Sequence, residues 1–295
     1  MTTSSGLIIV VTGANSGIGR ATALHLAGLG HRVFGTVRSL DSASKLLAAC
    51  AQRNVSVDLI ELDVTDSKSV ARGFCDVLRA TGRIDVLVNN AGIGGNGVVE
   101  EASIEQYEAS FDVNVSGAIR CIQQVLPGMR ERRSGTIVNV TSVVGRLAAI
   151  AQAPYVASKW ALEGVSEELA HELAPFGIRV AIVEPGVTKS SIFAKNIDAP
   201  HATGAYDDHY RRMFQFYAAG IANASPADEV ARVIEHAIAT DSPRLRYACS
   251  WGGESITAGR RSITDEDWVG LGAAADDDSY FQGFQQAFGV DLRKS

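Results

Sequence analysis

The chain has 295 residues, of which 46% are hydrophobic and 20% charged, and its formal net charge is −6. This length and composition are typical of one large α/β domain, and the dispersed basic residues argue against a nucleic-acid surface. The four cysteines lie far apart, which predicts reduced thiols in a cytoplasmic protein rather than a disulfide framework. The apolar run 7–11 is too short for a signal peptide or a membrane span, and the histidines lack ligand spacing, so no metal site is expected.

Short apolar runs rich in β-branched residues alternate with longer segments along the chain. These runs are continuously apolar rather than alternating, as expected for strands that are buried on both faces. They predict strands at 7–12, 32–37, 56–61, 86–89, 136–140, 179–183 and 245–248.

The segments between these runs carry the spacing of amphipathic helices. Strand, helix and strand repeated in this order predict right-handed βαβ units, and therefore a doubly wound parallel sheet with helices on both faces. No linker or internal repeat divides the chain, so we expect a single domain. The predicted helices cover 17–29, 42–52, 67–80, 104–132, 155–173 and 227–239.

The segment 188–225 is too long for a simple connection between the sixth strand and the next core helix. Its apolar residues recur at i, i+3, i+4, i+7 and i+11, which places them on one side of a helix. Such a helix either packs on the core or covers a ligand at the carboxyl ends of the strands. We expect a lid inserted in a catalytic domain that spans 1–250. The stripe consists of Tyr210, Met213, Phe214, Tyr217 and Ile221.

The remaining segment, 251–295, contains glycines and an acidic run at 276–278. We expect this extension to be partly mobile or to lie at a subunit contact. Phe281, Phe284 and Phe288 can still dock on an apolar surface, for example across such a contact.

A glycine-rich turn, 12–19, joins the first predicted strand to the first predicted helix. Glycines at such a turn let the backbone approach a pyrophosphate, and the helix N-terminus offers free N–H groups and the positive end of its dipole. A tight connection without a ligand is the alternative. The position directly after the first strand of a βαβ series favours a nucleotide site.

The end of the second strand indicates which dinucleotide is bound. An NAD site usually carries a carboxylate there for the ribose 2′-hydroxyl, whereas this chain has Arg38 and Ser39. A guanidinium can hold a 2′-phosphate, so NADP(H) is preferred over NAD(H), although Arg38 can also be a solvated residue at a strand end. Asp63, after the third strand, either accepts a hydrogen bond from the adenine amino group or caps the next helix.

Tyr155 and Lys159 are four residues apart in a predicted helix and therefore share one face. A tyrosine hydroxyl has a pKa near about 10, and a neighbouring cation lowers that pKa by stabilising the phenolate. Ser142 lies directly after the fifth predicted strand, where its hydroxyl can reach the same reacting atom. The three side chains together predict a proton donor for a carbonyl group.

Together these residues resemble the classical short-chain dehydrogenase/reductase family, whose fold is a Rossmann-type sheet of about seven strands. The surroundings of Arg38 and the run 155–164 resemble its hydroxysteroid and retinol dehydrogenase branches. The match extends over about residues 6–190 and comprises 12–19, Asp63, 89–92, Asn114, Ser142, Tyr155, Lys159, Pro185, Gly186 and Thr188.

The resemblance implies a role for each catalytic position. Tyr155 is the acid in reduction and the base in oxidation, and Lys159 lowers its pKa and binds the nicotinamide ribose. Ser142 polarises the substrate carbonyl, and Asn114 fixes a helix kink and a water that carries protons from Lys159. The implied cofactor-binding residues are Gly13, Asn15, Ser16, Gly17, Ile18, Gly19, Arg38, Ser39, Asp63, Val64, Asn90, Ala91, Gly92, Tyr155, Lys159, Pro185, Gly186, Val187 and Thr188.

The resemblance further implies an NADP-dependent interconversion of a secondary alcohol and a ketone or aldehyde in a homodimer or homotetramer. A non-catalytic NADP(H) sensor and an epimerase or dehydratase relative are the alternatives. The apolar flank of the site predicts a hydrophobic substrate, such as a steroid-like, retinoid-like or other lipophilic carbonyl compound. The predicted substrate-binding residues are Ser142, Val144, Tyr155, Phe193, Tyr210, Phe214 and Tyr217.

Overall fold

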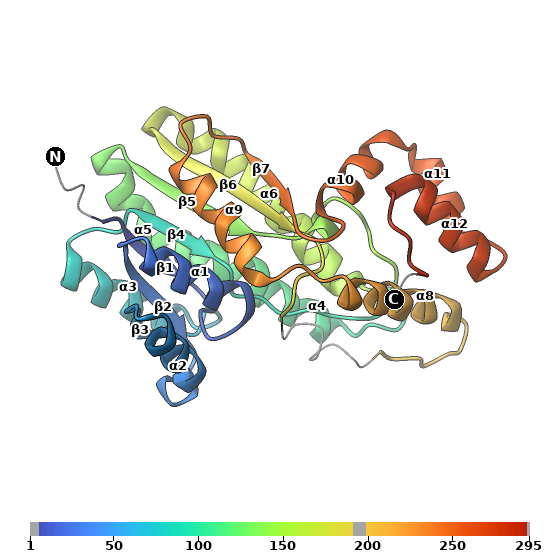
Figure 1. The fold of residues 1–295 in the computed structure, drawn as a ribbon, viewed down its shortest axis with the longest axis horizontal. Coiled ribbons are helices and arrows are strands. Elements are labelled where there is room, and N and C mark those ends of the chain that lie inside the picture. Colours follow the sequence, from blue (N-terminus) through green and yellow to red (C-terminus); the bar gives the residue numbers. More distant parts are fainter. Residues whose placement is uncertain (1–5, 191–198, 294–295) are drawn as a thin grey trace.

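A computed structural model of the chain describes residues 6–190 and 199–293. Seven parallel strands form one sheet in the order β3-β2-β1-β4-β5-β6-β7 (Figure 1). The predicted doubly wound parallel sheet is thereby confirmed, and all seven predicted strands are present. The strands are β1 (Ile8–Val11), β2 (Arg32–Val37), β3 (Asp58–Glu61), β4 (Val86–Asn89), β5 (Gly135–Val140), β6 (Ile178–Pro185) and β7 (Arg246–Cys249).

Helices cover both faces of the sheet, which explains why its strands are apolar throughout. On β1, Ile9 and Val11 belong to one buried cluster and Val10 to the other, following the two-residue period of a strand. The first cluster includes side chains of α1 (Gly17–Gly28), α2 (Ser44–Arg53) and α9 (Ala227–Ala239), and the second includes side chains of α3 (Ser67–Thr81), α5 (Gly117–Arg132) and α6 (Ala153–Leu173).

The order of the strands reverses at β1, which pairs with β2 on one side and β4 on the other. In open α/β sheets, ligands bind outside the carboxyl ends of the strands at such a switch point. Four of the predicted site positions follow strand ends at this edge, since Gly13, Asn90 and Ser142 come shortly after β1, β4 and β5, and Gly186 directly follows β6.

The predicted helix 104–132 is divided by a π-helical turn. The first part, α4 (Ile104–Phe111), begins with a capping box in which Ser103 and Gln106 bind each other's backbone N–H groups. The turn η2 (Asp112–Ser116) then widens the helix before α5 begins, and Asn114 lies inside it. A π turn of this kind is the helix kink expected at Asn114.

Four helices lie together beyond the carboxyl edge of the sheet (Figure 1): α8 (Asp207–Ala222), α10 (Gly253–Ser262), α11 (Asp265–Gly272) and α12 (Asp277–Phe288). The helix predicted from the aromatic stripe is therefore present as α8. An ion pair joins α8 to α12, with 2.9 Å between Nε of the buried Arg212 and Oδ1 of Asp277.

The extension after residue 250 packs on the rest of its own chain. Phe281, Phe284 and Phe288 are buried in a cluster with Val144 and Leu147 of the segment after β5. The expected mobility or subunit contact of 251–295 stays a prediction. Among the described helices, none has the length and the apolar sequence that crossing a membrane requires.

Candidate active site

The glycine-rich turn after β1 packs tightly against the loop after β4. Gly13 has a φ of +67°, and a Cβ there would lie 2.9 Å from Cα of Ala91. A Cβ at Gly19 would overlap the side-chain amide of Asn90. The backbone can take this path only with glycine at these two positions. Gly17 and Ile18 then begin α1, so the N-terminus of this helix lies at the edge of the sheet where the predicted site residues gather.

Thr12 joins the same two loops by hydrogen bonds. Its hydroxyl oxygen accepts the backbone N–H groups of Asn90, at 2.9 Å, and of Ala91, at 3.0 Å. The side-chain amide of Asn90 donates in return to the carbonyl of Thr12 at 2.9 Å. Asn90 and Ala91 therefore hold the loop after β4 in place. Thr12 does the same from β1, a role that no prediction assigned to it.

Asn114 connects the loop after β4 to α6. Its Oδ1 accepts the N–H of Ile93, and its Nδ2 donates to the carbonyl of Ile93 and to Oγ of Ser158, all at 2.9 Å. Ser158 in turn donates to the carbonyl of Tyr155 at 2.8 Å. A Cβ at Gly92 would lie 3.1 Å from Oδ1 of Asn114, so the whole loop is fitted around this buried amide.

Ser142 lies at the start of the short 3-10 helix η3 (Val143–Gly145), directly above the end of β5. Its Oγ accepts the N–H of Val144 at 3.3 Å and lies 3.4 Å from the carbonyl oxygen of Pro185. The hydroxyl also hydrogen-bonds the side chain of Tyr155. The structure thus brings together Ser142 and Tyr155, thirteen residues apart in the sequence, as predicted.

The pKa of Tyr155 shifts in the direction opposite to the one predicted. Burial raises the pKa of this phenol to about 12, and the hydrogen bond from Ser142 only partly offsets that effect. Desolvation destabilises the phenolate because few dipoles replace the lost water. The nearby ammonium, with Nζ of Lys159 5.7 Å from the ring centroid of Tyr155, does not reverse the shift in this structure.

Lys159 is buried, although it carries an ammonium group. Its Nζ donates to the carbonyl of Val140, at the end of β5, at 3.0 Å. Burial lowers the pKa of Lys159 to about 8, and the negative charge of Glu163 partly offsets this effect. Lys159 is therefore the group of the pair that changes its charge in the weakly alkaline range.

The residues expected to select the dinucleotide lie at the end of β2. Arg38 is exposed directly after this strand, and it makes no hydrogen bond or ion pair with the described part of the chain. Ser39 precedes the 3-10 helix η1 (Leu40–Ala43). The side-chain amide of Asn15 donates to the carbonyl of Ser42 at 3.0 Å, so the glycine-rich turn is tied to this segment. Ser16, the N-cap residue of α1, lies beside it.

Asp63 is not the cap of α3, because Asp66 has that role and accepts the N–H of Lys68. One carboxylate oxygen of Asp63 accepts the N–H and the hydroxyl of Thr65, at 2.9 and 2.8 Å. These bonds lower the pKa of Asp63, so the group is a carboxylate at neutral pH. The carbonyl of Val64 accepts a hydrogen bond from Arg120 at 3.0 Å. Of the two interpretations, capping of the next helix is wrong.

The segment after β6 is fastened to the segment after β7. The N–H of Gly186 donates to Cys249 at 2.8 Å, and that of Val187 donates to Trp251 at 3.0 Å. The hydroxyl of Thr188 donates to Oγ of Ser250 at 3.0 Å. Pro185 ends β6 and offers its carbonyl to Ser142, so this predicted nicotinamide-facing segment adjoins a predicted catalytic residue.

Helix α8 contributes two tyrosines with different surroundings. Tyr210 is fully buried, and its hydroxyl donates to Glu101 at 2.7 Å, so in this structure it anchors α8 instead of facing a substrate. Tyr217 donates to Oδ1 of Asn96 at 2.7 Å. Burial raises the pKa of Tyr217, and the nearby Tyr155 adds to this effect. Phe214 contacts Tyr217 edge-on.

Two of the predicted substrate-binding residues have different outcomes. Val144 is buried against the aromatic side chains of α12, while Phe193 lies outside the described residues. Asn96 and Glu101, which accept hydrogen bonds from the two tyrosines of α8, were not among the predicted site residues. No local motif marks them, because their partners lie more than 100 positions later in the chain.

The comparisons with known proteins agree with this arrangement. The family model of the short chain dehydrogenases matches residues 7–200. The mouse 17-beta-hydroxysteroid dehydrogenase type 1 is 36% identical over 251 residues, which cover 81% of this chain and 72% of the mouse protein.

Solved structures share the fold. A short-chain dehydrogenase from Streptomyces avermitilis has a TM-score of 0.79 and 36% identity, over 92% of this chain and 100% of that chain. A variant of actinorhodin polyketide ketoreductase, solved with NADPH, has a TM-score of 0.70 and 30% identity, over 83% of this chain and 97% of that chain.

The sheet order, the glycine-rich turn, the buried amide at the π turn and the Ser142–Tyr155–Lys159 group occur in one chain with this extent of sequence similarity. The chain therefore belongs to the short-chain dehydrogenase/reductase family and is an NAD(P)-binding oxidoreductase of that family.

Proposed function

We propose that the protein is an NADP-dependent oxidoreductase that interconverts a secondary alcohol and a ketone or aldehyde on a hydrophobic substrate. The observation that carries the proposal is the convergence of Ser142, Tyr155 and a buried Lys159 at the carboxyl edge of the sheet. A buried ammonium beside a phenol costs stability, and perturbed groups of this kind are typical of functional sites.

The chain fits a dinucleotide at this edge. Gly13 and Gly19 allow a close backbone approach at the N-terminus of α1, which suits a pyrophosphate. The exposed guanidinium of Arg38 suits a 2′-phosphate, and no carboxylate directly follows β2 to bind a free 2′-hydroxyl. Asp63 remains a candidate for the adenine end, and Pro185 to Thr188 for the nicotinamide end. When bound, the cofactor supplies or accepts the hydride.

The protein side of the reaction is a proton transfer. In reduction, the hydroxyl of Tyr155 donates its proton to the substrate oxygen, while Ser142 donates a hydrogen bond to the same oxygen. The ammonium of Lys159 stabilises the phenolate that remains. In oxidation, the phenolate accepts the proton of the alcohol. Asn114 holds the loop after β4 against α6 and so keeps these groups in place.

Apolar and aromatic side chains next to Tyr155 support a lipophilic substrate. The ring of Tyr155 packs against the buried cluster that contains Val144 and Phe284, with Phe216 and Trp251 at its edge. We propose that α8, the described helix of the predicted lid 188–225, covers the substrate. In this arrangement 1–250 is the catalytic domain, and the extension 251–295 supports the lid.

The test is oxidation of NADPH with a panel of lipophilic ketones and aldehydes, followed by nicotinamide absorbance. Tyr155→Phe keeps the apolar ring but loses the proton, so kcat should fall by about 10²–10⁴-fold. Tyr107→Phe, on α4, is the matched control and should retain full activity. Full activity of Tyr155→Phe would contradict the proposal.

The same assay distinguishes the alternatives. Tight NADPH binding without turnover of any substrate would favour a sensor, and substrate conversion without net NADPH consumption would favour an epimerase or dehydratase. For the cofactor, Arg38→Asp should lower kcat/KM with NADPH and raise it with NADH. An unchanged ratio would show that Arg38 does not select the cofactor.

We also propose a cytoplasmic homodimer or homotetramer that pairs through α4, α5 and α6. Exposed apolar side chains on α4 and α6 support this surface: Ile104 is 67% exposed, Trp160 48% and Phe111 37%. Trp160→Glu should shift the mass measured by light scattering toward the monomer. The same change at the exposed Leu78 of α3 should leave the mass unaltered.

A further inference from the structure

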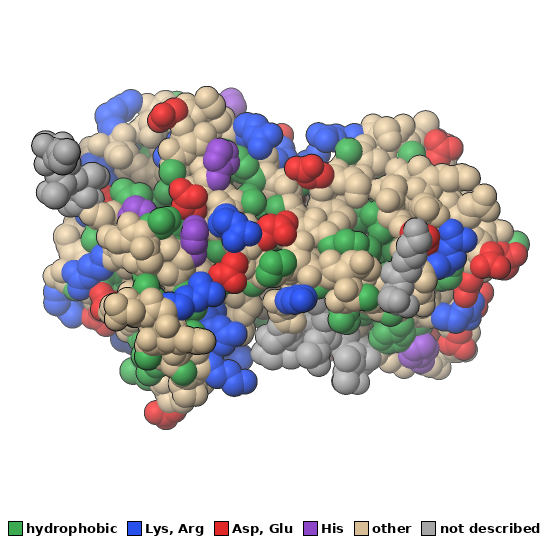
Figure 2. Space-filling model, viewed as in Figure 1, with side chains coloured by type: hydrophobic (Ala, Val, Ile, Leu, Met, Phe, Trp, Pro, Cys, Tyr) green, Lys and Arg blue, Asp and Glu red, His purple; other side chains and the backbone are tan. Residues whose placement is uncertain are grey.

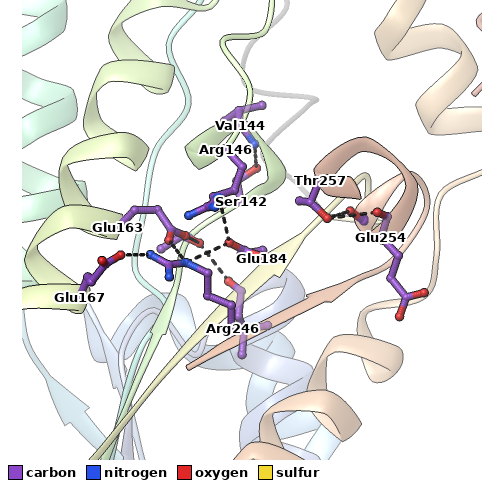
Figure 3. A network of polar contacts seen from close by, with 12 residues as sticks. Ser142, Val144, Arg146, Glu163, Glu167, Glu184, Arg246, Glu254 and Thr257 are labelled. Atoms are coloured by element: carbon purple, nitrogen blue, oxygen red, sulfur yellow. Dashed lines mark hydrogen bonds and ion pairs between the residues drawn. The ribbon is translucent and has the colours of Figure 1, made fainter. Parts of the chain in front are cut away.

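A group of charged side chains, including two buried carboxylates, lies close to Ser142 (Figure 3). Glu163 of α6 is buried, and its Oε1 accepts the hydroxyl of Thr141 at 2.6 Å. Its other oxygen lies 2.9 Å from Nε of Arg246, on β7. The same guanidinium pairs with Glu167 at 2.6 Å and lies 3.6 Å from the carboxylate of Glu184, on β6. Three elements, α6, β6 and β7, and the residue after β5 therefore meet around one guanidinium and three carboxylates.

Three members of this group, Thr141, Glu163 and Glu184, are close in sequence to predicted site residues. Thr141 immediately precedes Ser142, and Glu184 immediately precedes Pro185, whose carbonyl lies 3.4 Å from the hydroxyl of Ser142. Glu163 is four residues after Lys159 and so lies one turn further along the same face of α6. A Cβ at Gly145, just after Ser142, would lie 2.9 Å from Cγ of Glu163, which leaves this carboxylate little room to move.

The sequence alone does not account for a charge at this position. A buried carboxylate is costly unless it is paired and hydrogen-bonded, and an apolar residue would pack α6 on the sheet at lower cost. Both oxygens of Glu163 have partners, so the cost is largely offset. A carboxylate that is kept in place in this way acts on the groups around it through its position and its charge.

We propose that Glu163 is a positioning residue of the active site: it binds Thr141 and so places Ser142 against α6, and its negative charge stabilises the ammonium of Lys159. The inference rests on the proposed function for its kinetic consequences, but not for the charge of Lys159. Fixing the hydroxyl of Ser142 relative to Tyr155 preserves the geometry of proton transfer, in which small displacements cost much rate.

The charged groups around Glu163 decide its effect on pH dependence. Arg246 faces it from β7 and Glu184 from β6, while Lys159 and Glu167 lie on α6 itself. Burial lowers the pKa of Lys159 to about 8, and Glu163 raises it toward its ordinary value. Removing the charge of Glu163 must therefore lower the pKa of Lys159 further. Arg146 and Arg261 lower the pKa of Glu184.

Two variants separate the two effects. Glu163→Gln removes the charge but keeps an oxygen for Thr141, so the loss of kcat at high pH should begin at a lower pH than in the wild type. Thr141→Val removes the hydroxyl but keeps the charge. It should lower kcat by about tenfold, which corresponds to about 1.4 kcal/mol, without moving the pH profile.

Glu167→Gln is the matched control, because it makes the same chemical change on the same helix and against the same guanidinium. The carboxylate of Glu167 is largely exposed in the wild type. The kcat and the pH profile of Glu167→Gln should therefore match those of the wild type.

The titration of Lys159, followed by NMR of ¹³C-labelled lysine and assigned with Lys159→Met, gives a readout that needs no substrate. Its pKa should be lower in Glu163→Gln than in wild type and Glu167→Gln. Equal values in all three proteins, or wild-type kcat in Thr141→Val, would overturn the inference. If the wild type reduces no carbonyl compound while the titration shifts as expected, the proposed function fails and the charge effect of Glu163 stands. Should Glu163→Gln not fold, Thr141→Val still decides the positioning role.

Discussion

Two regions meet at the carboxyl edge of the sheet and are held together by different forces. The catalytic edge, which consists of Thr12, Asn114, Ser142, Tyr155 and Lys159 with their partners, is fixed by hydrogen bonds between buried polar groups. The aromatic cover, which consists of Phe216, Trp251, Tyr280, Phe284 and Phe288, is fixed by contacts between rings. Centroids of neighbouring rings in the cover lie 4.6–6.2 Å apart. Figure 2 shows apolar side chains exposed over this part of the molecule.

The difference has a functional consequence. A hydrogen bond sets both distance and direction, and a buried group that loses its partner is costly, so the catalytic edge tolerates few changes. Apolar contacts depend mainly on volume, and many combinations of side chains fill the same space. Under the proposed function, the chemistry would therefore depend on the polar region, and changes in the cover would alter the choice of substrate.

The largest effect is expected in the aromatic cover. Phe284 is buried between Phe216, Tyr280 and Phe288, so Phe284→Ala should lower the free energy of unfolding by about 3–5 kcal/mol. Thermal unfolding measures this loss, with Phe284→Leu as the smaller change. KM for a large lipophilic ketone should rise, whereas kcat for a small ketone should stay near the wild-type value. An equal fall of kcat/KM for the large and the small ketone would contradict the separation of the two regions.

The next prediction distinguishes the two regions by how the stability of the protein depends on pH. Burial, and then the charge of Glu163, raise the pKa of Glu184 to about 7, while Arg146 and Arg246 oppose this. A carboxyl that holds its proton more tightly when folded adds stability at pH values below its unfolded pKa, and this stability is lost as the pH rises through the folded pKa.

As the pH rises from about 4.5 to about 7, the ionisation of Glu184 should therefore lower the free energy of unfolding by roughly 3 kcal/mol. Unfolding by urea at pH 5 and pH 8 should show this slope in the wild type and a smaller one in Glu184→Gln. Phe284→Leu should keep the wild-type slope, because the cover has no group that titrates in this range. A slope that Glu184→Gln leaves intact would mean that other groups cause it.

A smaller effect should follow when Thr12, which joins two loops of the catalytic edge, loses its hydroxyl group. Thr12→Val leaves the N–H groups of Asn90 and Ala91 without their acceptor, and should cost about 2 kcal/mol. Because the glycine-rich turn rests on this loop, KM for the cofactor should rise as well. Thr12→Ser keeps the hydroxyl oxygen and should have the stability and the cofactor KM of the wild type. If Thr12→Ser is as impaired as Thr12→Val, the methyl group of Thr12 matters more than its hydrogen bonds.

The smallest effect is expected outside both regions, where Tyr210 anchors α8. Tyr210→Phe removes the hydrogen bonds to Glu101 and Val98 but keeps the ring in the cluster under α8, so stability should fall by about 1 kcal/mol. KM for a large substrate should rise a few-fold if α8 is a lid. Identical steady-state constants would show that the position of α8 does not depend on this bond.

The regular parts of the fold could be predicted because they follow from local patterns. Continuous β-branched runs such as β6 need no distant information to be recognised as buried strands. The glycines at 13 and 19 likewise mark a turn at which a side chain has no room, and the structure shows the contacts that require this. The π turn that separates α4 from α5 at Asn114 was expected only from the family resemblance, because the apolar periodicity of the predicted helix 104–132 continues across it.

Tertiary contacts decided what local patterns could not. The pKa of Tyr155 depends on how far folding removes water, and the expected lowering by Lys159 gave way to a rise from burial. Tyr210 and Tyr217 share one stripe on α8, yet they have different environments because Glu101 and Asn96 come from a loop far away in the sequence.

The sequence by itself therefore determined the doubly wound parallel sheet and the glycine-rich turn, and it predicted the catalytic residues, since each is recognised from residue types at short spacings. Only the tertiary structure decided which charges are buried, which tyrosine is enclosed and how the extension after residue 250 packs against the site. These properties depend on distances between segments that lie far apart along the chain, and desolvation and pairing act through those distances.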